Sequence, residues 1–79
     1  MRNSSSEWEA VAEKAGSSLK GAEKDFLDEA SKEKPDPAKL EVAKMKYQTA
    51  MRVFEAIQEG FKAFNDTIRG LIQKLSGNS

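Results

Sequence analysis

Two prolines one residue apart, in the stretch KPDPAKL at residues 34–40, constrain this chain more than any other feature. A proline inside a helix lacks an amide donor, and its ring clashes with the preceding turn. Pro35 also pushes Lys34 out of the helical region, so a helix before it must end. Asp36 is a favoured N-cap and Pro37 is a favoured first helical residue, so a second helix begins here. The stretch therefore predicts a corner between two helices.

The residues after the corner repeat apolar side chains in steps of three and four, which is the pattern of one long amphipathic helix. The unbroken row consists of Leu40, Ala43, Tyr47, Ala50, Phe54, Ile57, Phe61, Phe64, Ile68, Leu71 and Leu75. Further apolar residues flank the row at Val42, Met45, Met51, Val53, Ala56, Ala63 and Ile72. This surface is wider than a two-stranded coiled coil needs. We therefore expect a helix over residues 38–75 that contacts more than one neighbour.

The first half of the chain carries a weaker row with the same spacing. Its members are Trp8, Val11, Ala15, Leu19, Ala22, Phe26 and Ala30. Gly16 and Gly21 interrupt it, and each glycine costs ~1 kcal/mol relative to alanine inside a helix. The pattern predicts a helix over residues 6–32 that is frayed or kinked between the two glycines, after a disordered start at residues 1–5.

Together these elements predict a single all-α domain over residues 1–79. Because the corner at residues 33–37 is short, we expect an antiparallel helical hairpin, with a short tail at residues 76–79. The second helix should outrun the first, and an exposed apolar row of that size usually marks a protein–protein surface. We therefore expect self-association or binding to a partner. The expected interface residues are Phe54, Ile57, Phe61, Phe64, Ile68, Leu71, Ile72 and Leu75.

The composition narrows the chemistry that the chain can perform. Thirteen basic and thirteen acidic residues give a formal charge of zero, which argues against nucleic-acid binding. The sequence has no cysteine and no histidine, so disulfides, thiolate metal sites and the commonest general base are excluded. We find no glycine-rich phosphate loop and no nucleophile–base pair. We therefore expect no enzyme activity, no metal site and no cofactor.

Two charged groups and one aromatic residue have alternative readings. The acidic group is Glu23, Asp25, Asp28, Glu29 and Glu33. We interpret it as a solvated helix face rather than a metal site, because Lys24 and Lys32 lie among these residues. The basic group is Lys39, Lys44, Lys46 and Arg52. We interpret it as solvated or paired between subunits rather than as a phosphate or membrane site. Trp8 either caps the open end of the hairpin or lies at an intersubunit contact.

The N-terminal stretch MRNSSSEWEAVAEKAG contains no long apolar run, and no later segment is apolar enough over a sufficient length to span a bilayer. We therefore expect neither a cleaved secretory signal nor a membrane span. A protein of this kind would leave a cell only by a route that reads no such signal.

Two stretches carry a resemblance to a known family. KPDPAKL is similar to a corner of Lys-Pro, polar residues and then Pro-Ala-Leu, one residue longer in the family. FKAFNDTIRGLIQKL, residues 61–75, is similar to a C-terminal pattern of Lys, two apolar residues, a polar residue and Asp, ending in apolar-apolar-Gln-polar-apolar. The spacing from Pro37 to Lys62 fits without a gap, and an early tryptophan such as Trp8 is common in one branch. Over residues 34–75 the chain resembles the needle-filament subunits of bacterial type III secretion systems.

The resemblance implies a virulence-associated structural subunit that polymerises through its C-terminal helix into a hollow extracellular needle, which conducts unfolded effector proteins. It implies export to the bacterial cell surface without a cleaved signal, after a chaperone-bound stage in the cytoplasm. The implied partners are copies of the chain, export chaperones, a needle-tip protein and basal-body components. Lys62, Asp66 and Gln73 match family positions near the lumen.

Two alternatives to the needle subunit remain open. Inner-rod subunits of the same apparatus have a similar amphipathic C-terminal helix. A small helical export chaperone or adaptor would instead lend its apolar helix to one partner chain, which predicts a one-to-one heterodimer and no self-assembly.

Overall fold

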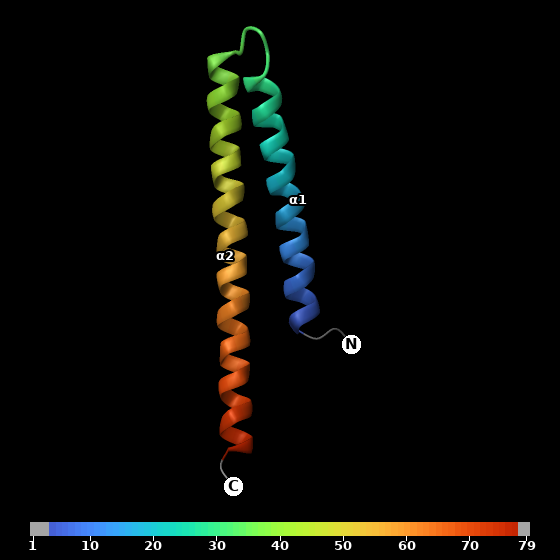
Figure 1. Cartoon of the computed structure of the whole chain (residues 1–79), viewed down its shortest axis with the longest axis vertical. Coiled ribbons are helices and arrows are strands. Elements are labelled where there is room, and N and C mark those ends of the chain that lie inside the picture. Colours follow the sequence, from blue (N-terminus) through green and yellow to red (C-terminus); the bar gives the residue numbers. More distant parts are fainter. Residues whose placement is uncertain (1–3, 78–79) are drawn as a thin grey trace.

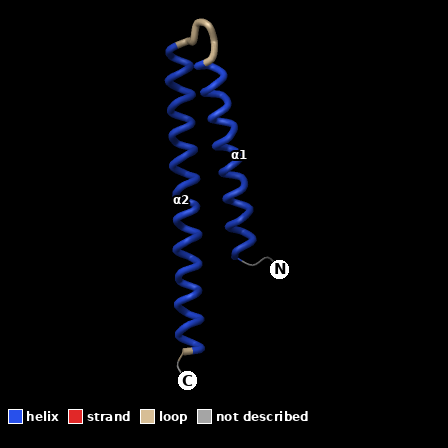
Figure 2. Tube along the Cα trace, viewed as in Figure 1, coloured by secondary structure: helices blue, strands red, loops and turns tan. Residues whose placement is uncertain are grey.

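A computed structural model describes residues 4–77 of the chain. Over this range it consists of two helices and no strands, α1 (Ser4–Ala30) and α2 (Pro37–Ser76). The helices lie side by side and run in opposite directions (Figures 1 and 2). The molecule is accordingly long and narrow, with principal extents of 69 × 22 × 14 Å. The prediction of an all-α chain is confirmed.

The limits of α1 differ from the expected range of residues 6–32. The helix begins at Ser4 and ends at Ala30, where Ser31 donates its backbone N–H to the carbonyl oxygen of Leu27 in a final turn. The last two of the five residues that were expected to precede the helix are therefore its first two residues. Residues 1–3 lie outside the described part of the chain.

The interior of α1 is continuous through Gly16 and Gly21, where the sequence predicted fraying or a kink. A Cβ at Gly16 would lie 3.5 Å from a ring carbon of Phe54, so this glycine faces α2 at close range. No atom lies within 4 Å of the Cβ position at Gly21. Packing against α2 therefore outweighs the weak helix propensity of this stretch, as tertiary contacts commonly do.

The second helix extends slightly past both ends of the expected range, residues 38–75. Pro37 is its first residue and Ser76 its last, and the backbone N–H of Gly77 donates to the carbonyl oxygen of Gln73 at 2.7 Å. The first residue of the expected tail is thus helical and the second is the C-cap. Residues 78–79 lie outside the described part of the chain.

The side chain of Asp36 organises the end of the corner over residues 31–36, where α2 begins. Asp36 has extended backbone angles (φ −79°, ψ 117°). Its carboxylate accepts from the backbone N–H groups of Ala38 at 2.9 Å and Lys39 at 3.3 Å, which are the otherwise unpaired donors at the start of α2. Pro35 lies just before this N-cap and belongs to neither helix.

The two helices meet along one row of half-buried side chains on each, and no apolar side chain among the described residues is fully buried. The row on α2 comprises Leu40, Ala43, Tyr47, Ala50, Phe54, Ile57, Phe61 and Phe64. The row on α1 comprises Trp8, Ala12, Ala15, Leu19, Ala22 and Phe26. Rings stack near both ends of the contact: Trp8 on Phe61 with centroids 6.1 Å apart, and Phe26 on Tyr47 at 6.3 Å.

The row on α1 departs from the predicted one at two positions. Val11 is exposed and Ala12 takes its place, bordering a groove together with Phe61. A methyl side chain fits beside the Trp8–Phe61 stack, and this step of four from Trp8 is as compatible with a helix as the predicted step of three. At the other end, Ala30 is exposed and Glu29 is buried.

Candidate interaction surfaces

The last turns of α2 extend beyond the start of α1 (Figure 1). We call residues 66–76 the overhang. Its large apolar side chains are increasingly exposed toward the end of the helix: Ile68 39%, Leu71 52%, Ile72 57% and Leu75 85%. They continue, at three-four spacing, the row that faces α1 nearer the corner. The overhang thus presents an apolar contact row without cover.

The eight predicted interface residues divide into two groups of four. Phe54, Ile57, Phe61 and Phe64 are half-buried in the row that contacts α1. The other four form the overhang row. Full burial of one Leu or Ile side chain is worth ~1.5–3 kcal/mol, so covering the overhang would stabilise a complex by several kcal/mol before the cost of association.

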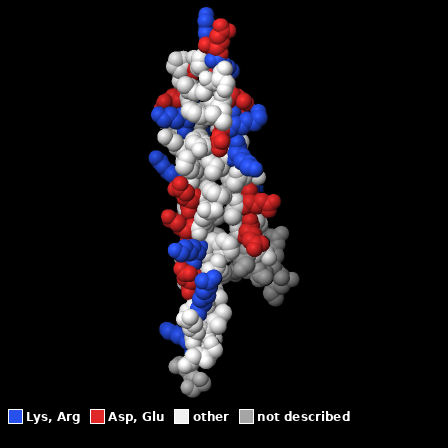
Figure 3. Space-filling model, viewed as in Figure 1, with Lys and Arg blue, Asp and Glu red and all other residues white. Residues whose placement is uncertain are grey.

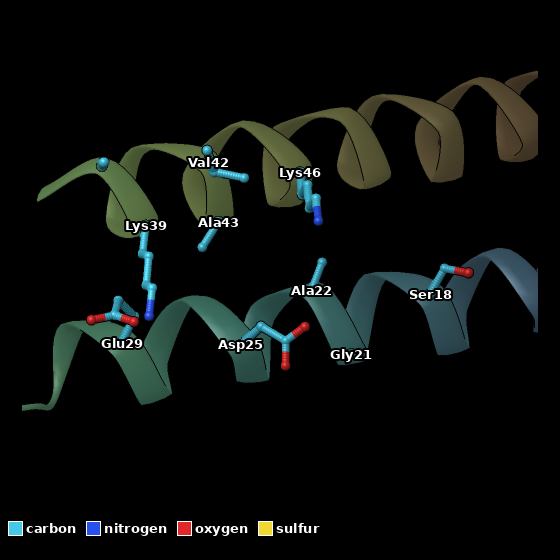
Figure 4. Close-up of a pocket in the computed structure, with 10 residues that line it drawn as sticks. Ser18, Gly21, Ala22, Asp25, Glu29, Lys39, Val42, Ala43 and Lys46 are labelled. Atoms are coloured by element: carbon cyan, nitrogen blue, oxygen red, sulfur yellow. The ribbon is translucent and has the colours of Figure 1, made fainter. Parts of the chain in front are cut away.

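A groove between the helices near the corner forms a second uncovered surface, which we call the corner groove (Figure 4). Its volume is about 690 Å³. Its lining residues are Ser18, Gly21, Ala22, Asp25, Glu29, Ala38, Lys39, Val42, Ala43 and Lys46. Ala22 and Ala43 point toward one another between the helices, while Lys39 and Lys46 extend from α2 toward α1. Five of the ten lining residues are glycine, alanine or serine, and their small side chains leave the groove open.

Apolar side chains continue past the corner groove along the same side of α2. Val42 and Lys46 are shared with a neighbouring depression that Met45 and Thr49 also border. Val42, Met45 and Val53 are each about half exposed. In the space-filling view, charged side chains gather mostly along the edges of the molecule and leave an uncharged band over both helices (Figure 3). The pair therefore offers apolar surface beyond the contact between its own helices.

A groove on the opposite side of the helix pair is lined mainly by polar and charged residues. We call it the polar groove. Its lining residues are Glu9, Ala12, Gln58, Phe61, Lys62, Asn65, Asp66 and Arg69. Two of the three residues expected near a lumen, Lys62 and Asp66, therefore meet in one groove. The third, Gln73, follows Asp66 by seven residues, so it lies on the same side of the helix, exposed on the overhang.

Glu29 is the one buried charged side chain among the described residues, with 7% of its surface exposed. One carboxylate oxygen accepts from the backbone N–H of Asp36 at 3.1 Å. The other accepts from the ammonium of Lys32 at 2.9 Å. The hydrogen bond from the Asp36 N–H, reinforced by that from Lys32, lowers the pKa of the Glu29 carboxyl. Glu29 thus ties the end of α1 to the N-cap of α2.

The interpretation of the acidic group as a solvated helix face is therefore wrong for Glu29. It fits the neighbouring residues better. Asp28 pairs with Lys24 at 3.0 Å on the exposed surface, and this hydrogen bond raises the pKa of the lysine. Nothing in the sequence signals the burial of Glu29, because its partner is a backbone N–H group that only the corner brings near. Over residues 4–77 no group of three or more carboxylates is arranged to hold a metal ion.

Trp8 and the basic group lie in different parts of the helix pair. Trp8 packs within the chain, stacked on Phe61 and tilted toward Phe64, with its ring over Gly60. It therefore closes the open end of the helix pair. The basic group does not form one site: Lys39 and Lys46 border the corner groove, whereas Lys44 and Arg52 do not line it.

Neither helix, over its described length, is apolar enough to cross a membrane. Comparison of the chain with protein families, with curated proteins and with solved structures found no match in any of the three.

Proposed function

We propose that this chain is a structural subunit of a hollow extracellular needle of a type III secretion apparatus, assembled by homopolymerisation through α2. The overhang carries the proposal. A helix that ends in Ile68, Leu71, Ile72 and Leu75, all exposed, has its most apolar surface where α1 no longer covers it. The resemblance of residues 34–75 to needle subunits supports the same assignment.

Assembly follows from the inability of one helix pair to bury its own apolar surface. The overhang lies at one end of the molecule, and the corner groove with Val42 and Met45 lies toward the other. Two different patches that bind each other make a heterologous contact, which generates an open helical filament when the rotation between copies does not close a ring. A filament of overlapping copies would cover both patches on every interior subunit.

The polar groove supplies a surface suited to a wet channel. Lys62, Asp66 and Gln73 lie on one side of α2, away from the corner groove. If that side faces the filament axis, charged and amide groups line the conduit and leave the apolar patches for contacts between subunits. An unfolded chain passing through the channel would then meet few apolar surfaces to which it could bind.

Electron microscopy and sedimentation of the purified protein test the proposal. We expect long filaments of uniform width with a central channel, in equilibrium with monomer below a critical concentration. A monomer or a discrete dimer that persists at high protein concentration would overturn it. Short assemblies of fixed length would favour an inner-rod subunit of the same apparatus.

An adaptor or export chaperone is the second candidate, because the overhang would equally serve one partner helix. Affinity purification of the tagged chain from its source cells, followed by mass measurement, separates the two. A stable one-to-one heterodimer with no self-assembly would establish the adaptor. Recovery of copies of the chain itself would support the needle subunit.

A further inference from the structure

The overhang and the corner groove cannot meet within one chain. The groove is lined by the first turns of α2, between Ala38 and Lys46, whereas the overhang is formed by its last turns. The helix between them is continuous, and the molecule is 69 Å long. A contact between the two surfaces therefore has to join different copies of the chain.

We infer that the corner groove is the receptor for the overhang of a second copy. This inference rests on the proposed function and deepens it, because it names the two surfaces that meet in the filament. The shapes are complementary: small side chains such as Ser18, Gly21 and Ala22 leave the groove open, and the overhang offers Leu and Ile side chains that need cover. Bulky side chains of one helix packing into spaces over small ones is the usual mode of close helix contact.

Charge on the two surfaces gives one attractive and one repulsive contact in this pairing. The charged residues of the overhang after Asp66 are Arg69 and Lys74, both basic. Five residues apart, they lie on the two flanks of the apolar row, so one of them faces the α1 side of the groove in either orientation of the docked helix. That side carries Asp25, which is exposed and forms no ion pair within residues 4–77. The other basic residue faces Lys46 at the opposite rim.

This contact explains how a pair of helices can propagate. Each copy supplies one overhang and one groove, so a docked copy always leaves one surface of each kind free at the ends of the assembly. The apolar row of the overhang is also continuous with the row under α1. The docked overhang would therefore extend the intrachain packing into the next subunit.

Chemical cross-linking tests the inference directly, because the chain contains no cysteine of its own. One preparation carries Ser18→Cys, in the groove, and a second carries Ile72→Cys, in the overhang. The two are mixed at assembling concentration and treated with a short bismaleimide. We expect a cross-linked dimer containing one chain of each kind.

Ser17→Cys is the matched control, since Ser17 is also exposed on α1 but does not line the groove. We expect at least about fivefold more mixed dimer with Ser18→Cys than with Ser17→Cys. Filaments that form normally but cross-link equally with both variants would overturn the groove assignment and leave the needle proposal intact. Cross-linking through the groove in a discrete oligomer would support the groove and overturn the filament. Failure of any self-association would overturn both.

Charge variants give an independent readout with opposite signs at the two rims. Asp25→Lys should raise the critical concentration for assembly about fivefold, the effect of losing one pair worth ~1 kcal/mol, and Lys46→Glu should lower it. Glu23→Lys makes the same charge change on α1 outside the groove and should have little effect. Equal effects of Asp25→Lys and Glu23→Lys would contradict the docking geometry.

Occlusion of the groove separates docking from folding. The Cβ position at Gly21 has free space in the monomer, and leucine has a higher helix propensity than glycine. Gly21→Leu should therefore raise the melting temperature of the monomer. It should also abolish the cross-link between Ser18→Cys and Ile72→Cys. Assembly and cross-linking unchanged by Gly21→Leu would overturn the inference.

Discussion

Glu29 shows how a single carboxylate can organise a corner that has no apolar core around it. It accepts the backbone N–H of Asp36 with one oxygen and the ammonium of Lys32 with the other. Both bonds are stronger with the ionised carboxylate, and they lower the pKa of Glu29 in the folded state below the usual value of about 4.3. A carboxyl group with a lowered folded pKa stabilises the fold above its unfolded pKa and loses that contribution as the pH falls through the folded pKa.

We therefore predict that the monomer loses thermal stability as the pH falls below about 4, with the corner loosening first. Circular dichroism melts of dilute protein over this range would measure the change. Glu29→Gln keeps an amide oxygen that can accept from Asp36 but removes the titrating group. The variant should be less stable at neutral pH, and its melting temperature should depend less on pH in the acid range. An unchanged pH profile in Glu29→Gln would show that other carboxylates control the acid response.

Gly60 is the residue at which the open end of the pair is most sensitive to an added methyl group. A Cβ there would lie 2.8 Å from one ring carbon of Trp8 and 3.3 Å from another. We predict that Gly60→Ala destabilises the monomer by ~1 kcal/mol, because displacement of the stacked ring outweighs the gain in helix propensity.

Gly70 provides the matched control on the same helix, since no atom lies within 4 Å of its Cβ position. Gly70→Ala should stabilise α2 by ~0.5–1 kcal/mol. Thermal melts should therefore show a lower melting temperature for Gly60→Ala, whereas Gly70→Ala, in the overhang, should raise the helical signal and leave the melting temperature nearly unchanged. Equal stabilisation by both would mean that Trp8 does not rest on Gly60.

At the scale of the helices, the sequence predicted most of what the structure contains. Proline and aspartate chemistry placed the start of α2 within one residue of Pro37, and the three-four spacing identified the row that contacts α1. The first helix was harder to predict, because alanine and valine at neighbouring positions fit the same helical period. The choice of Ala12 over Val11 depends on the rings of α2 opposite them.

The division of the long row on α2 was also hidden in the sequence. Phe64 and Ile68 occupy equivalent positions in one unbroken pattern, yet Phe64 lies near Trp8 with ring centroids 6.4 Å apart, and Ile68 lies past the contact. What separates them is where α1 begins in space, which depends on the length of the other helix and on the corner. The apolar pattern within α2 carries no information about where α1 begins beside it.

This division makes aspartate at the two positions behave differently. Ile68→Asp should abolish assembly while leaving the melting temperature of the monomer nearly unchanged, because the carboxylate stays in water until a second copy covers it. Phe64→Asp should abolish assembly and also lower the melting temperature, because it removes a ring from beside Trp8. Sedimentation and circular dichroism on both variants would measure this. Normal filaments from Ile68→Asp would contradict the role of the overhang.

At the scale of the whole molecule, the helix pair is too thin to shield its own apolar side chains. A body 22 × 14 Å across leaves each helix open to solvent over most of its circumference, and none of the described apolar side chains is buried. The fold is therefore specified by its corner and by one row of contacts. Further stability has to come from neighbouring molecules, which couples folding to assembly.

Removal of residues 71–79 tests whether the end of α2 belongs to the monomer or to the assembly. The deletion takes away Leu71, Ile72 and Leu75, which are more than half exposed and lie beyond α1. We predict that the helical signal falls only in proportion to the residues lost and that the melting temperature of the dilute monomer is nearly unchanged. Filament formation should disappear, because the apolar row that bridges copies is gone. Circular dichroism and light scattering on the truncated chain would measure both. Unfolding of the whole chain would instead place these residues in an intramolecular core, and the role of the overhang in assembly would have to be abandoned.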